Sequence, residues 1–157
     1  MPRIVNEVFR RVQKRGTERL SFCVAFALFE YALKERFRVN GDGVAWANWS
    51  EFERSSPDLT ANPRPALRDA LEYVRNNPPM VQMARSGRSV FEQQDPRGTG
   101  NEAICELLKR IRNNLIHGGK QPYTQRDRRL VNAALEIIEG FLEADDDLRA
   151  AFQRGAR

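Results

Sequence analysis

Residues 18–37 read ERLSFCVAFALFEYALKERF and form the most apolar stretch of this 157-residue chain. At the period of an α-helix, its apolar side chains fall into two stripes. The first stripe is Phe22, Phe26, Phe29, Leu33 and Phe37, and the second is Leu20, Cys23, Val24, Ala27 and Tyr31. A helix that is apolar on two sides packs at the centre of a bundle. The stretch therefore predicts a central helix whose aromatic rings form core and are not a platform for stacking bases.

Helical spacing recurs on both sides of this stretch. Before it, Ile4, Val8 and Val12 predict a helix over 3–14 that ends at Gly16. After it, apolar periodicity predicts helices over 47–54, 64–75, 101–117 and 124–143, the last capped by Thr124. A short helix or tail follows Asp145, and its Leu148 and Phe152 are expected to pack on the bundle or on a second chain. The length fits one domain over 1–157, so we expect an all-α, antiparallel bundle of about five or six helices.

The middle of the chain, about residues 38–100, reads as a variable insertion into this bundle. Trp46 and Trp49 are expected to pack the insertion onto the core, with contact to a base or a partner as the alternative. Residues 80–100 are predicted to be irregular, with turns at 86–88 and 96–100. This segment either covers an active cleft or is an inert connection.

The charge distribution is more informative than the net charge of +5 and the pI of about 9.7. Basic residues concentrate between positions 109 and 129, as expected of a surface that binds a phosphate backbone; a solvated helix face is the alternative. The cluster comprises Lys109, Arg110, Arg112, Lys120, Arg126, Arg128 and Arg129. Of these, Lys109, Arg110, Lys120, Arg126 and Arg129 are the predicted phosphate contacts.

Composition argues against several other classes of protein. No run of eighteen apolar residues exists and the N-terminus has no apolar signal core, so we expect a cytoplasmic protein without membrane contact. Cys23 and Cys105 are far apart within apolar helical patterns, which favours buried free thiols over a disulfide. With these two cysteines and one histidine, neither a metal centre nor a cofactor site is predicted.

That single histidine, His117, lies in the sequence RNNLIHGGK, residues 112–120. Histidine has an unperturbed pKa suited to moving protons at neutral pH, and an arginine can grip two phosphoryl oxygens as charge develops on them. In a regular helix Arg112 and His117 would point roughly 140° apart. Two arrangements could bring them together: a turn at the helix end, because Gly118 and Gly119 predict a helix stop there, or a dimer with two motifs facing each other.

The stretch resembles the R-x4-6-H signature of the HEPN superfamily, including the polar residue after the arginine and the trailing glycines and lysine. The resemblance is specific over residues 110–120 and loose elsewhere. It implies a metal-independent endoribonuclease that leaves 2′,3′-cyclic phosphate, with Arg112 and His117 as the catalytic pair and Asn113 as the intervening polar residue. It also implies a homodimer with apposed motifs, RNA as substrate, and a toxin or antiphage effector, with an antitoxin or other defence protein as a further partner. The alternative is a noncatalytic module that binds RNA or nucleotide, or scaffolds a partner protein.

Glu30 interrupts the apolar stretch with a carboxylate, which must be paired or reach the surface. Arg112 is one candidate partner, and Glu30 would then orient the arginine from behind the site. The alternative is an exposed position or a pair with Lys34, one turn later.

Overall fold

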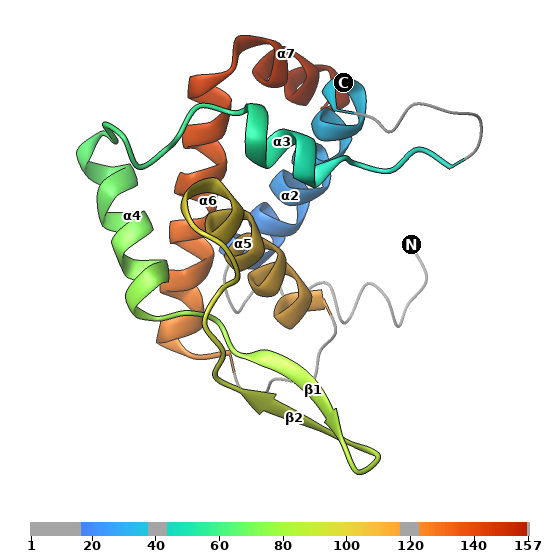
Figure 1. The fold of residues 1–157 in the computed structure, drawn as a ribbon, viewed down its shortest axis with the longest axis vertical. Coiled ribbons are helices and arrows are strands. Elements are labelled where there is room, and N and C mark those ends of the chain that lie inside the picture. The colour runs from blue at the N-terminus through green and yellow to red at the C-terminus, as the bar shows by residue number, and fades with distance from the viewer. Residues whose placement is uncertain (1–16, 38–43, 117–122, 157) are drawn as a thin grey trace.

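Six helices and one β-hairpin make up the regular structure of the computed structural model, which describes residues 17–37, 44–116 and 123–156 (Figure 1). The predicted helix over 3–14 lies outside these residues. The elements are α2 (Thr17–Arg36), α3 (Trp49–Ser55), α4 (Pro65–Asn76), β1 (Val81–Arg85), β2 (Arg88–Glu92), α5 (Gly100–Ile116), α6 (Gln125–Ala144) and α7 (Asp146–Gly155). The fold is therefore mostly helical, as predicted, and the all-α prediction was wrong because it omitted the hairpin.

The core is built on one side of α2 and on the inward stripes of α5 and α6. Phe22, Phe26, Phe29 and Leu33 of the first predicted stripe are buried. The second stripe is not: Val24 is 52% exposed and Tyr31 is 40% exposed. The prediction that both sides of this helix are covered was wrong, because α5, α6 and α7 contact α2 without enclosing it.

The insertion returns to the core through α3. Phe52 is fully buried, with its ring centroid 4.8 Å from that of Phe141 and 5.5 Å from that of Phe29. Trp49 stacks 6.0 Å from Phe26, so its predicted packing role is confirmed. Trp46 is 67% exposed, and the same prediction for it was wrong. One helical segment thus closes the aromatic core, while the chain just before it stays at the surface.

Residues 81–92, predicted to be irregular, form an antiparallel hairpin that projects from the helices (Figure 1). Its register runs from Val81 opposite Glu92 to Arg85 opposite Arg88. Ser86 and Gly87 connect the strands with φ values of 49° and 73°. Positive φ at both central residues matches the twist of a two-residue hairpin, which is why a Ser-Gly pair joins the strands here. The turn was predicted correctly and the strands were missed.

The C-terminal helices follow the predicted pattern closely. Thr124 caps α6 in a capping box with Asp127, as predicted. Asp145 caps α7 by accepting bonds from the backbone N–H groups of Asp147 and Leu148. Leu148 is fully buried and α7 packs against α2, so of the two predicted docking partners the bundle is the one observed. Among the helices described, none has the length and apolar character needed to cross a membrane.

Candidate functional site

Arg112 lies in the last described turns of α5, held half-buried by three groups. Its Nη2 donates to Glu30 Oε1 at 3.2 Å, and its Nη1 donates to Asn113 Oδ1 at 2.8 Å. The guanidinium carbon lies 5.3 Å from the centroid of the Phe26 ring. Within the described residues these bonds use two of its five N–H donors. The guanidinium of Arg112 is therefore held in one orientation, and its remaining N–H donors can bind an anion.

The ion pair between Arg112 and Glu30 confirms one of the two predicted environments for this carboxylate. The arginine side chain is 29% exposed and that of Glu30 is 30% exposed, so the pair lies at the edge of the core. Glu30 lies on α2, so the ion pair joins the motif helix α5 to α2. Its predicted role in orienting Arg112 for catalysis fits this contact and stays a prediction.

The other motif residues are placed only in part. α5 reaches Ile116, and the next residue, His117, lies outside the described residues, as does Lys120. Asn113 is exposed and accepts a hydrogen bond from Arg112. Its predicted contact with the histidine or with phosphate stays a prediction.

The four predicted phosphate contacts that the structure describes do not form one patch. Arg110 is 8% exposed and lies inside the protein. Its guanidinium donates to Glu106 Oε1 and to the backbone carbonyls of Gln94 and Asp95, at 2.5–3.1 Å. These bonds give Arg110 a structural role, and we leave it out of the proposed RNA surface. Lys109 pairs with Glu53 at 3.1 Å, on the side of α5 that faces α3.

Arg126 and Arg129 lie together on the first turns of α6, beside the hairpin. Arg126 Nη2 donates to the carbonyls of Pro78 at 2.8 Å and Asn77 at 3.3 Å. The Arg129 guanidinium lies 4.3 Å from the centroid of the Tyr73 ring. Neither is paired with a carboxylate in the contacts described, so both keep positive charge near the C-terminal end of α4.

A small pocket next to the motif helix brings in two residues that the sequence did not indicate. The Arg19 guanidinium lies 4.7 Å from the centroid of the Tyr123 ring, and both residues line a cavity of about 30 Å³ with Asn114 of α5. The Tyr123 hydroxyl is buried without a hydrogen-bond partner among the described residues. Burial, reinforced by Glu18, raises the pKa of Tyr123 to about 12. No local pattern links residues 19 and 123, so only the fold could reveal this contact.

The two cysteines are free thiols, as predicted; Cys105 is buried, whereas Cys23, predicted to be buried, is partly exposed. Burial raises the pKa of Cys105 strongly and that of Cys23 more modestly, with Arg19 opposing the second shift. Since the thiolate is the nucleophilic form, neither cysteine is activated for covalent catalysis.

Comparisons of the chain with protein-family models, with curated proteins and with solved structures found no significant match.

Proposed function

We propose that this protein is a metal-independent endoribonuclease of the HEPN type, acting through Arg112 and His117. The observation that carries the proposal is the setting of Arg112. A cation is held by Glu30, Asn113 and the Phe26 ring, five positions before the single histidine, with donors left for an anion. A purely structural arginine would satisfy its donors internally, as Arg110 does two residues earlier.

The chemistry follows from these two residue types. The 2′-hydroxyl oxygen of a nucleotide attacks the adjacent phosphorus while a base takes its proton, and the bond between phosphorus and the 5′-oxygen breaks as that oxygen is protonated. The products are a 2′,3′-cyclic phosphate and a 5′-hydroxyl. His117 supplies the proton transfer, and Arg112 stabilises the negative charge that develops on the phosphoryl oxygens.

A homodimer completes this site in the proposal. The two proton transfers act at opposite sides of the phosphorus, and two apposed motifs would supply two histidines, one accepting and one donating. A shared cleft also removes the need for Arg112 and His117 of one chain to converge. In this form the protein would act on RNA as a toxin or antiphage effector, under the control of an antitoxin or another defence protein.

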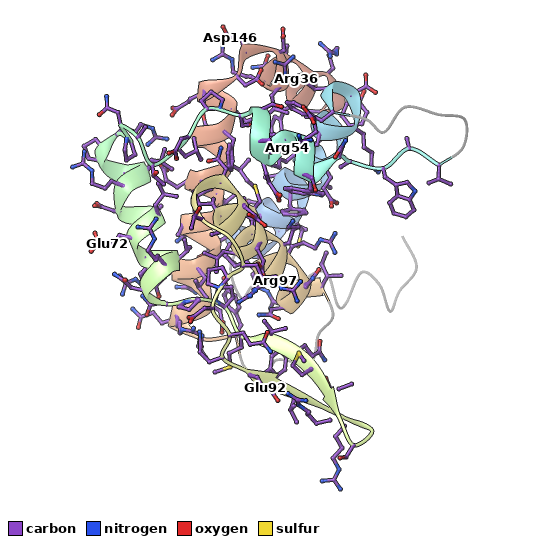
Figure 2. The ribbon with its side chains drawn as sticks, in the orientation of Figure 1. Arg36, Arg54, Glu72, Glu92, Arg97 and Asp146 are labelled. Atoms are coloured by element: carbon purple, nitrogen blue, oxygen red, sulfur yellow. The ribbon has the colours of Figure 1, made fainter. Side chains whose placement is uncertain are left out.

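The test is cleavage of total RNA in EDTA by the wild-type protein, by His117→Ala and by Arg112→Ala. Arg54→Ala is the matched control, because Arg54 (labelled in Figure 2) is an exposed arginine on α3 whose partners among the described residues, Glu51 and Ser50, lie on the same helix. We expect the wild type and the control to cut and leave cyclic phosphate ends, and both motif variants to lose at least about 100-fold in rate. Equal cutting by all four proteins would refute the assignment. RNA binding without cutting by the wild type would favour the noncatalytic module.

A further inference from the structure

Three polar side chains, two from the motif helix and one from α6, hold the base of the hairpin by hydrogen bonds to its backbone. Asn114 Nδ2 donates to the Met80 carbonyl at 2.8 Å, just before β1 begins. Arg126 holds the carbonyls of Asn77 and Pro78 on the same incoming limb. On the outgoing limb, the buried Arg110 holds the carbonyls of Gln94 and Asp95. Both limbs are thus fixed to the body beside Arg112, so the hairpin has a defined direction relative to the motif.

The hairpin extends away from the helices beyond these anchors (Figure 1). Strands of five residues span about 16 Å, at roughly 3.3 Å per residue. Residues 84–89, which include the turn, are exposed. An isolated two-stranded hairpin is only marginally stable in water, so a projecting arm of this length adds little to the core. Its position calls for a function outside the bundle.

The tip carries an unfavourable arrangement of charge. Arg85 and Arg88 are directly opposite each other in the pair that closes the turn. Like charges in this position destabilise a hairpin. Glu92 compensates Arg85 through two bonds, from Nε at 2.8 Å and from Nη2 at 3.0 Å, but no acidic residue of the described chain pairs with Arg88. A bound polyanion would reduce the repulsion between Arg85 and Arg88 by neutralising the charge of Arg88.

We propose that the hairpin is an RNA-contacting arm whose tip, through Arg88, binds a phosphate of the substrate several nucleotides away from Arg112. The inference rests on the proposed ribonuclease function and adds a substrate class to it. The substrate is an RNA long enough to reach both the motif and the tip of the arm. A dinucleotide would contact the motif and miss the arm.

The outer edges of β1 and β2, which no other described strand pairs with, also suit a protein partner that adds a third strand. Such a partner would bind through backbone hydrogen bonds and would not explain two opposed arginines at the tip. The charge of Arg88 is therefore the property to change.

The experiment measures binding of a long single-stranded RNA and of a dinucleotide in the His117→Ala background, so that no cutting occurs, over a series of KCl concentrations. Arg88→Glu should weaken binding of the long RNA about tenfold at low salt and leave dinucleotide binding unchanged. It should also reduce the slope of log affinity against log salt by about 0.7, the value for one phosphate contact on a single strand. Arg88→Lys should stay within a few-fold of the parent, because the charge is kept.

The matched control is Arg154→Glu, a charge reversal at an exposed arginine of α7. The proposal is supported if Arg88→Glu loses affinity and Arg154→Glu does not. The proposal that the hairpin contacts RNA would be overturned if both reversals weakened long-RNA binding equally. It would also be overturned if Arg88→Glu left long-RNA binding intact. Failure of the parent to bind any RNA would overturn the ribonuclease proposal, so the two failures are distinguishable.

Discussion

Arg110 and Arg112 are two residues apart on one helix, and we expect the loss of Arg110 to lower mainly stability and the loss of Arg112 to lower mainly activity. Each is changed to methionine, which keeps an unbranched side chain and removes the charge. Arg110 is 8% exposed, and its loss removes the donor to the carbonyls of Gln94 and Asp95 and to Oε1 of Glu106. Breaking a buried, hydrogen-bonded charge network costs about 3 kcal/mol or more. For a domain of this size that corresponds to a Tm lower by roughly 6–12 °C.

Arg112→Met should behave differently because the Arg112–Glu30 pair is partly solvated. Its removal should cost about 1 kcal/mol or less, a Tm shift of roughly 2–4 °C at most. Its cleavage rate should fall by about 100-fold or more, since a donor aimed at the transition state is lost. Urea unfolding and thermal melts give the stabilities, and cleavage of total RNA below both melting temperatures gives the activities. If Arg110→Met is as stable as the wild type, or Arg112→Met loses as much stability as Arg110→Met, the assignment of the two roles is refuted.

Three further changes test the packing and electrostatics around the site. Burial raises the pKa of Glu106 but the hydrogen bonds from Arg110 and from the Arg97 backbone lower it further, so its net pKa lies below the ordinary value of 4.5. The ionised Glu106 carboxylate therefore contributes its full stabilisation above pH 4.5, and this contribution is lost as the pH falls through the lower folded pKa. Glu106→Gln should flatten the acid side of a curve of unfolding free energy against pH. An unchanged curve would contradict this. Gly140→Ala should lower the free energy of unfolding in urea by about 1–3 kcal/mol, because the new Cβ would lie 2.7 Å from Leu67 Cδ2. In the Leu67→Ala background the same change should cost less, because the clashing side chain is gone. Strictly additive effects would count against the contact. Tyr123→Phe should leave Tm unchanged or raise it, since it removes a buried hydroxyl without a described partner, and a loss above about 1 kcal/mol would show that the hydroxyl is bonded.

Tertiary structure decided which of the basic residues face outward. From the sequence alone, Arg110 was predicted to contact phosphate together with more exposed members of the cluster between 109 and 129. Arg110 lies three residues after the buried Leu107, on the inward side of α5, whereas Arg112 is rotated by about 200° and reaches the surface. The helical phase of the apolar stripe was a signal that could have separated them. The carbonyl partners of Arg110 could not be foreseen, since they come from a loop about fifteen residues earlier.

Local patterns in the sequence determined most of the helices and their caps. α5 and α6 follow apolar residues that repeat at the helical period, and Thr124 begins α6 as its side chain demands. The RNNLIHGGK stretch and its proposed chemistry are also properties of the sequence alone. These features depend on neighbours within a turn or two of the chain, and so they can be read without knowing the fold.

Only the fold decided the long-range pairings: Glu30 with Arg112 across 82 positions, Arg19 with Tyr123, and the hairpin with the end of the motif helix. The fold also decided that one apolar stripe of α2 is covered by neighbouring elements, whereas Val24 and Tyr31 of the other stripe are exposed. The physical reason is common to all of them. Periodicity states which side chains share a face, but burial and pairing depend on which other element lies against that face, and that is set by packing of the whole chain.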